Sequence, residues 1–315
     1  MTTIILGLLI GFALLIWSAD RFVIGAVGLA QNLNISPLVI GLVIIGFGTS
    51  APEFLISGVA AWQGNSGLAL GNAVGSNIAN IALILGVTAL LTPILVSRQT
   101  LLREFPLLFA AMGLVWFLLR DSLLSLTDAC IMLVTLFIVI GYLATTSKNE
   151  SEENCDNYKC SIAMSLFWTV LGLVLLLISS NILVSSCVKL AHQFGISDLV
   201  IGLTIVAIGT SLPELAASIT GALKHHTDLA IGNVLGSNIF NTLGVISVPG
   251  FISAYHVPNE VLTRDFPIMF GLSFFLLALA YMTHKGKGMN RLSGIALLMC
   301  FIGFQVTLYF QSVQS

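Results

Sequence analysis

The chain alternates between long apolar runs and short polar interruptions, and the runs have the length of membrane-spanning helices. A helix that crosses a hydrocarbon core of about 30 Å needs roughly 20 mostly apolar residues. The period-two alternation of barrel strands is absent from these runs. The pattern predicts ten helices, at residues 3–30, 38–62, 68–91, 104–119, 123–144, 162–189, 198–223, 228–248, 265–283 and 290–310. We therefore expect an all-α membrane protein.

The least apolar stretch, TTSKNESEENCDNYKC, lies at the middle of the chain. It divides the predicted helices into two sets of five. We expect a first five-helix unit at 1–144, a short linker at 145–161 and a second five-helix unit at 162–315. Cys155 and Cys160 lie in the linker, where a redox role is one reading and a solvated segment with reduced thiols is the simpler one.

Composition agrees with a membrane location. Hydrophobic residues make up 57% of the 315 residues and charged residues 8%, and the mean hydropathy is +1.02. A soluble domain carries roughly 25% charged residues. The net charge of −2, without a basic patch interleaved with aromatic residues, argues against nucleic-acid binding. The lipid bilayer is the expected surrounding, and nothing in the sequence calls for a cofactor or an obligate protein partner.

Two motifs occur twice at one spacing. GTSAPE at Gly48 returns as GTSLPE at Gly209, and GNAVGSNIAN at Gly71 returns as GNVLGSNIFN at Gly232. The offset is the same in both cases, since 209 − 48 = 161 and 232 − 71 = 161. A unit with five spans enters the membrane upside down when it is repeated, so equivalent residues approach a common midplane. The sequence thus predicts two inverted five-helix repeats, an arrangement typical of secondary transporters.

Orientation follows from the basic residues of alternate loops. Nine Lys and Arg residues fall on one side of the predicted membrane and three on the other. Basic residues favour the cytoplasmic side, so the count predicts that both termini lie outside. The first ten residues have no basic region, and we interpret the first span as a retained helix and not as a cleaved signal.

A proline behind a glycine-rich stretch marks the second and seventh predicted helices. Pro52 has no N–H to give the carbonyl of Gly48, and Pro213 has none for Gly209. We expect a kinked or interrupted helix at each proline, with carbonyl oxygens free at mid-membrane depth. Such a backbone survives in lipid only when it is buried in protein or lines a wet cavity.

Polar side chains gather around the two prolines at helical spacing. Thr49 and Glu53 are four residues apart, as are Ser76 and Asn80, and the second half repeats both pairs. Carboxylates, amides, hydroxyls and carbonyls form an all-oxygen set, which suits Na⁺, Ca²⁺ or a similar hard ion and not zinc or copper. Two interpretations stay open beside this one. The asparagines can serve as hydrogen bonds between helices, and the hydroxyls can bond back to their own helix.

The paired GTSxPE and GSNIxN signatures resemble the alpha-1 and alpha-2 repeats of the calcium/cation antiporter superfamily, and the short loops are similar to those of its prokaryotic sodium/calcium exchanger branch. The resemblance covers nearly the whole chain. It implies a transporter, not an enzyme, which exchanges Na⁺ for Ca²⁺ by alternating access in a prokaryotic inner membrane. It also implies that the first and sixth helices slide across the other eight. The glycines Gly7, Gly11, Gly25 and Gly28 are candidates for that sliding contact.

The resemblance assigns a set of ion ligands by position. It implies that Glu53 and Glu214 are the central ligands and that Asn80 and Asn241 complete the middle of the site. The remaining implied ligands are Thr49, Ser50, Ser76, Thr210, Ser211, Ser237 and the carbonyls of Gly46 and Ala207. Some members, including the potassium-dependent branch, have Asp at the position of Asn241, so the asparagine argues against potassium dependence.

The net charge of the loaded site indicates whether exchange moves charge across the membrane. Two ionised glutamates are neutralised by one Ca²⁺, whereas three Na⁺ leave the loaded site at +1. The resemblance implies three Na⁺ for one Ca²⁺, and hence electrogenic exchange. One alternative is a proton-coupled antiporter of Ca²⁺ or a monovalent cation, in which a glutamate exchanges a proton. A membrane enzyme with paired carboxylates is a third class, which the lack of an HExxH motif disfavours.

Overall fold

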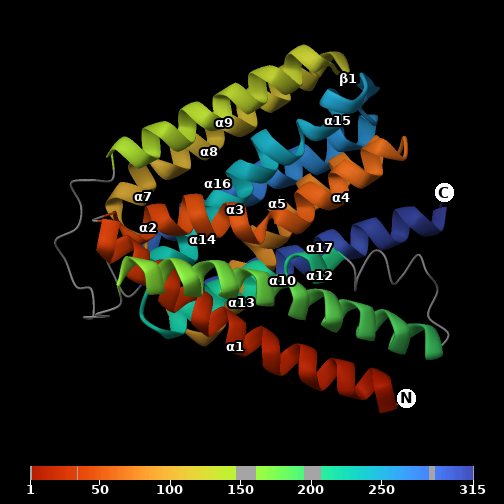
Figure 1. Cartoon of the computed structure of the whole chain (residues 1–315). Coiled ribbons are helices and arrows are strands. Elements are labelled where there is room, and N and C mark those ends of the chain that lie inside the picture. The colour runs from red at the N-terminus through yellow and green to blue at the C-terminus, as the bar shows by residue number, and fades with distance from the viewer. Residues whose placement is uncertain (1, 34, 147–160, 195–206, 284–287, 315) are drawn as a thin grey trace.

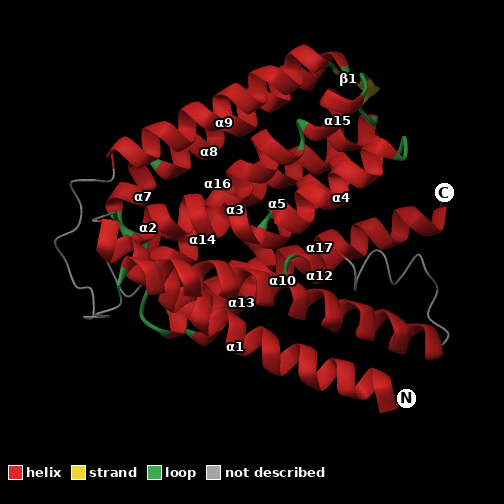
Figure 2. Ribbon diagram, in the orientation of Figure 1, coloured by secondary structure: helices red, strands yellow, loops and turns green. Residues whose placement is uncertain are grey.

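The computed structural model describes residues 2–33, 35–146, 161–194, 207–283 and 288–314, and these are almost entirely helical (Figure 2). Eight described helices are long and apolar enough to cross a membrane, and a bent pair, Pro37–Thr49 with Ala51–Trp62, makes a ninth. Residues 198–206 of the predicted span 198–223 lie outside the described part. The sequence prediction of an all-α membrane protein is confirmed.

Helices of the amino-terminal part are separated by short breaks and irregular turns. Here and below, η marks a π-helical turn, except that η3 is a 3₁₀ turn. The elements are α1 (Thr2–Leu33), α2 (Pro37–Ile40), η1 (Gly41–Ile45), α3 (Gly46–Thr49), α4 (Ala51–Trp62), α5 (Ser66–Ala79), η2 (Asn80–Ile84), α6 (Leu85–Leu91), α7 (Arg98–Leu102), α8 (Glu104–Leu118), η3 (Leu119–Asp121), β1 (Leu123–Leu124) and α9 (Leu126–Thr146).

The carboxyl-terminal part repeats much of this order. Its described elements are α10 (Ile162–Gln193), α12 (Ala207–Thr210), α13 (Leu212–Leu223), α14 (Thr227–Ile239), η6 (Phe240–Val245), α15 (Val248–Ile252), β2 (Tyr255–His256), η7 (Val261–Asp265), α16 (Phe266–Thr283) and α17 (Arg291–Gln314). The bounds of α4 and α13 differ by 161 at both ends, as do those of α3 and α12. The duplicated motifs therefore form the same local structure in both halves.

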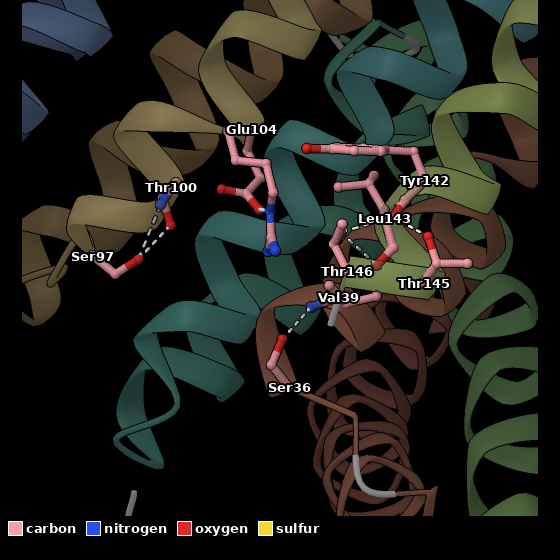
Figure 3. Close-up of polar contacts among 10 residues, drawn as sticks. Ser36, Val39, Ser97, Thr100, Glu104, Tyr142, Leu143, Thr145 and Thr146 are labelled. Atoms are coloured by element: carbon pink, nitrogen blue, oxygen red, sulfur yellow. Dashed lines mark hydrogen bonds and ion pairs between the residues drawn. The ribbon is translucent and has the colours of Figure 1, made fainter. Parts of the chain in front are cut away.

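Side chains at the ends of the elements fix several boundaries. Ser36 accepts a hydrogen bond from the Val39 amide at the start of α2, and Ser97 accepts one from the Thr100 amide at the start of α7 (Figure 3). These contacts satisfy amides that have no partner within the helix. Two-residue strands β1 and β2 pair antiparallel and tie the loop before α9 to the loop before η7.

Helices α1 and α10 lie side by side along one flank of the molecule, away from α8 and α9 (Figure 1). They run antiparallel, because Gly11 meets Leu183 near one end of the pair and Gly25 meets Thr169 near the other. The missing side chains of these glycines let the two backbones approach closely. We expected Gly7, Gly11 and Gly25 to face the rest of the bundle, but they face α10 within the pair.

Helix α14 is the central element of the fold. Its apolar span is buried throughout, and it packs against α13, α2, η1 and α3. Gly232 and Gly236 lie directly against the backbones of Leu38 and Leu42, where a Cβ atom would collide. The GNVLGSN motif thus brings the second half into close contact with the broken helix of the first half.

Candidate cation site

Two helices in matching positions carry the predicted carboxylates. α4 begins at Ala51 and α13 at Leu212, each after a break at a serine, and a proline occupies the first turn. Proline is tolerated there because the first amides of a helix have no acceptor within it. Glu53 and Glu214 therefore lie in the first turns of their helices, where the helix dipole favours a negative charge. Their exposed fractions are only 1% and 0%.

Each of the two carboxylates accepts a hydrogen bond from a serine hydroxyl. Ser76 donates from Oγ to Oε1 of Glu53 at 3.3 Å. Ser50 donates from Oγ to Oε1 of Glu214 at 3.4 Å, which is a contact between the two halves of the chain. Ser50 precedes Glu53 by three residues. The helix break of the first half therefore contacts the carboxylate of the second half and lies next to the carboxylate of its own half.

Carbonyl groups at the breaks receive side-chain donors. Ser237 donates from Oγ to the carbonyl oxygen of Gly46 at 3.3 Å, again across the two halves. Pro213 has no N–H for the carbonyl of Gly209, and Ser180 of α10 donates to that oxygen at 3.1 Å. The carbonyl of Gly209 therefore receives no hydrogen bond from position 213, as expected from the sequence, but it accepts one from the side chain of Ser180.

Several buried polar atoms in this region have no hydrogen-bond partner among the described residues. They are Oε2 of Glu53, Oε2 of Glu214, Oδ1 of Asn80, Oγ of Ser211 and both polar side-chain atoms of Asn241. Buried polar atoms are nearly always satisfied, so a group of unsatisfied oxygens requires an explanation. A hard cation bound by these oxygens would supply the missing partner.

Two further predicted residues belong to the short helix that precedes the second break. Ala207 begins α12 and Thr210 ends it. Thr210 and Ser76 line a cavity of about 400 Å³, which Arg264, Asp265 and apolar residues of α17 also border. A cavity beside the second break agrees with the requirement that irregular backbone in a membrane lines wet space or is buried.

Seven of the twelve predicted ligands make direct contacts with one another, in separate groups. These are Gly46, Thr49, Ser50, Glu53, Ser76, Ser237 and Glu214. Asn80, Asn241 and Ser211 contribute unsatisfied buried atoms. The π-helical turns η2 and η6 begin at or directly before the two asparagines, and such turns are frequent at functional sites.

Four further asparagines belong to the same region and were missed at the sequence level. Asn72 and Asn233 each donate to the carbonyl of the preceding glutamate, at 3.3 and 3.2 Å. Asn80 donates to Oδ1 of Asn238 at 3.0 Å, and Asn77 donates to Oγ1 of Thr242 at 2.8 Å. The signal for all four was present, because each is repeated at the 161-residue offset.

The donor atoms around the two carboxylates are mainly oxygens, the type of ligand that hard cations prefer. Within the described ranges, no group of three or more His, Cys, Asp or Glu side chains is placed to hold a metal ion. The two carboxylates instead stand among neutral oxygens from hydroxyls, amides and carbonyls. Such a set gives up a bound ion more readily than a cage of carboxylates would, because ligand charge tunes affinity.

Comparison with known proteins identifies the family. Residues 3–145 and 164–310 match the family described as "Sodium/calcium exchanger protein". The chain belongs to this sodium/calcium exchanger family. The resemblance noted in the sequence is thereby confirmed, with both duplicated motifs inside the matched ranges.

Individual relatives agree over nearly their full length. The chain is 46% identical to "Putative antiporter CaxA" of Alkalimonas amylolytica, over 96% of this chain and 97% of the relative. It is 31% identical to "Sodium/calcium exchanger MaX1" of Methanosarcina acetivorans, over 96% of this chain and 97% of that protein. Among solved structures, the sodium-calcium exchanger NCX_Mj soaked with Na⁺ and Sr²⁺ matches at a TM-score of 0.83 and 31% identity, covering 96% of this chain and 97% of that one.

Proposed function

We propose that this exchanger is a secondary antiporter that carries Na⁺ and Ca²⁺ in opposite directions through one buried cage. The observation that carries the proposal is the hydrogen bond from Ser50 to Glu214, since it brings the carboxylate of the second half to the helix break of the first. Unsatisfied oxygens on both glutamates support the same conclusion. The names of MaX1 and NCX_Mj favour Na⁺ and Ca²⁺ as the ions.

The ligand set of this cage is the twelve-residue set named above. Glu53 and Glu214 supply the charge, Asn80 and Asn241 the amide oxygens, and the threonines, serines and two carbonyls the remainder. Asparagine at position 241 keeps the number of carboxylates at two. No cofactor takes part, and the ions are cargo.

The architecture of the proposal is two inverted five-helix units, 1–144 and 162–315, joined by the linker 145–161. Together they place ten helices in a prokaryotic inner membrane, with both termini outside. Two features support an even number of spans. α4 and α13 have bounds 161 residues apart, and α1 begins on the same side of Figure 1 on which α17 ends.

Exchange is expected to be electrogenic. Three Na⁺ in a cage with two carboxylates leave one positive charge, whereas one Ca²⁺ leaves none. Each elementary charge that crosses the membrane is worth about 2.3 kcal/mol per 100 mV. The sliding of α1 and α10 as a pair would expose the cage to each side in turn, which their continuous mutual contact supports.

The first prediction tests the coupling ion and the charge together. In proteoliposomes with a clamped membrane potential, an outward Na⁺ gradient should drive ⁴⁵Ca²⁺ uptake, and an inside-negative potential should slow it because net positive charge leaves with the Na⁺. A pH gradient alone should drive none. Uptake that follows only the pH gradient would favour the proton-coupled alternative, and uptake independent of voltage would refute the three-to-one stoichiometry.

A further inference from the structure

Asn233 occupies a fully buried position where α14, α13 and the end of α3 meet. Its Nδ2 donates to the carbonyl oxygen of Glu214 at 3.2 Å and to Oγ of Ser218 at 2.9 Å. Its Oδ1 accepts from Oγ1 of Thr49 at 3.1 Å. One side chain therefore contacts the central glutamate of its own half and a predicted ligand of the other half.

The orientation of the amide is fixed by these partners. A backbone carbonyl can only accept, so the nitrogen of Asn233 must face Glu214. The oxygen is then left facing Thr49, whose hydroxyl must donate. The Thr49 hydroxyl has a single proton, and its possible acceptors are Oδ1 of Asn233, the carbonyl of Ile45 at 3.0 Å, Oγ of Ser237 at 3.5 Å and the carboxylate of Glu214.

This geometry has a consequence for ion binding. A hydroxyl that coordinates a cation offers a lone pair, and its proton must point elsewhere. We propose that Asn233 is a positioning residue, which turns the Thr49 proton away from the cage and holds Thr49 and Glu214 at a fixed separation. The inference rests on the cation cage proposed above. Partners that orient the ligands of a metal typically change affinity 10- to 100-fold when they are removed.

The first half contains the donor side of this arrangement. Asn72 donates from Nδ2 to the carbonyl of Glu53 and to Oγ of Ser57, both at 3.3 Å. Each asparagine follows its glutamate by 19 residues and its serine by 15. A contact used once can be packing, but its repetition beside both glutamates indicates a role in the site.

The test is a double-mutant cycle on the full-length exchanger. We compare wild type, Asn233→Ala, Thr49→Val and the double variant for Na⁺-driven ⁴⁵Ca²⁺ uptake per folded protein. Asn233→Ala should raise the half-saturating Na⁺ or Ca²⁺ concentration about tenfold, with a smaller change in maximal rate. In the Thr49→Val background the same substitution should have little further effect. Asn290→Ala, which removes a cap from α17 far from the site, controls for loss of stability.

Each outcome is decisive. Equal half-saturation in wild type and Asn233→Ala, or full additivity of the two substitutions, would overturn the positioning role. The same shift in Asn290→Ala would also overturn it, because the effect would then be one of stability. Wild type that transports no cation would refute the proposed function instead, and so the two failures are distinguishable.

A second inference comes from an ion pair outside the cage. Nζ of Lys224, directly after α13, lies 2.8 Å from Oδ1 of Asp20 on α1. α1 also packs along α13. At the 161-residue offset, Asp20 corresponds to Asn181 on α10, and Lys224 corresponds to Gln63 directly after α4. No comparable packing joins α10 to α4 in the described part of the chain.

The geometry points to a latch that holds α1 against α13 at one end of the bundle. Movement of the α1–α10 pair would exchange this contact for its counterpart between α10 and α4. That counterpart is uncharged, so the two end states differ by one ion pair. Because the pair is partly exposed, its effect on their ratio is at most about fivefold.

This latch is tested by the sidedness of Ca²⁺ affinity. Asp20→Asn should change the ratio of half-saturating Ca²⁺ at the two membrane faces up to about fivefold. The charge swap Asp20→Lys with Lys224→Asp should restore it. The mirrored pair Asn181→Asp with Gln63→Lys should shift the ratio in the same direction as Asp20→Asn, because it adds an ion pair to the opposite end state. An unchanged ratio in both Asp20→Asn and the mirrored variant would refute the proposal.

Discussion

Replacement of Glu214 by glutamine is expected to weaken Ca²⁺ binding about a thousandfold and to abolish measurable exchange. Two unit charges 4 Å apart attract by about 4 kcal/mol at an effective dielectric constant of about 20; the attraction is about twice that for divalent Ca²⁺, and the cost of dehydrating the ion offsets part of it. Each 1.4 kcal/mol is about tenfold in affinity. The glutamine keeps the size and one acceptor of the side chain, so the Ser50 contact can persist while the charge is lost.

Glu53→Gln should have the same effect when tested alone, because both carboxylates supply the charge of the one proposed cage. Glu260 lies on the surface, and Glu260→Gln is the matched control that should exchange normally. Ca²⁺-dependent thermal stabilisation in detergent separates a binding defect from misfolding. If either glutamine variant of the cage transports at the wild-type rate, the single two-carboxylate cage is wrong.

The sequence was sufficient to predict the helix breaks that precede Glu53 and Glu214. Proline acts locally, through a missing N–H and a ring that clashes with the preceding turn, so its effect can be read without tertiary information. The breaks at Ser50 and Ser211 have nearly the same backbone angles, φ −79° and −88°. Duplication then identified which of several intramembrane polar residues belong together.

The role of Asn233 could not be predicted in the same way. Its partners Glu214 and Ser218 are 19 and 15 residues away, and Thr49 is 184 residues away. No helical periodicity connects such positions. Only the packing of α14 against α3 and α13 places the amide between them.

The π-helical turns were also beyond the sequence analysis. They arise where one extra residue enters a helical turn, and the Asn-Ile-Ala and Phe-Asn-Thr segments show no local propensity for it. In the folded chain, η2 starts at Asn80 and η6 contains Asn241, so each turn includes a predicted ligand. Tertiary packing around these segments, rather than local sequence, decides their geometry.

The glycines of α1 illustrate a different limit. Their spacing indicated a close helix contact but not the identity of the partner. In the structure, Gly11 and Gly25 contact α10, and Gly172 of α10 contacts α1 in return. Their small size therefore holds the α1–α10 pair together, and the surfaces that would slide are on other faces of the two helices.

Gly172→Ala should consequently destabilise the protein by about 1–3 kcal/mol, the range for overpacked interiors. A Cβ atom at this position would lie 2.6 Å from the backbone nitrogen and 2.7 Å from the Cα of Phe22. Backbone atoms cannot rotate aside, so α1 and α10 must separate along their whole contact. Because the separation also moves Ser180 relative to the carbonyl of Gly209, we expect slower exchange per folded molecule.

The control for this substitution is Gly141→Ala on α9, where a Cβ atom meets nothing within 4 Å. That variant gains helix propensity, since glycine is about 1 kcal/mol less favourable than alanine within a helix. Thermal unfolding in detergent should therefore show that Gly172→Ala is less stable than Gly141→Ala. Measurement of ⁴⁵Ca²⁺ uptake should show that Gly172→Ala exchanges more slowly. Equal behaviour of the two would mean that α1 and α10 are not in backbone contact, and the proposal that they move as a pair would lose its structural support.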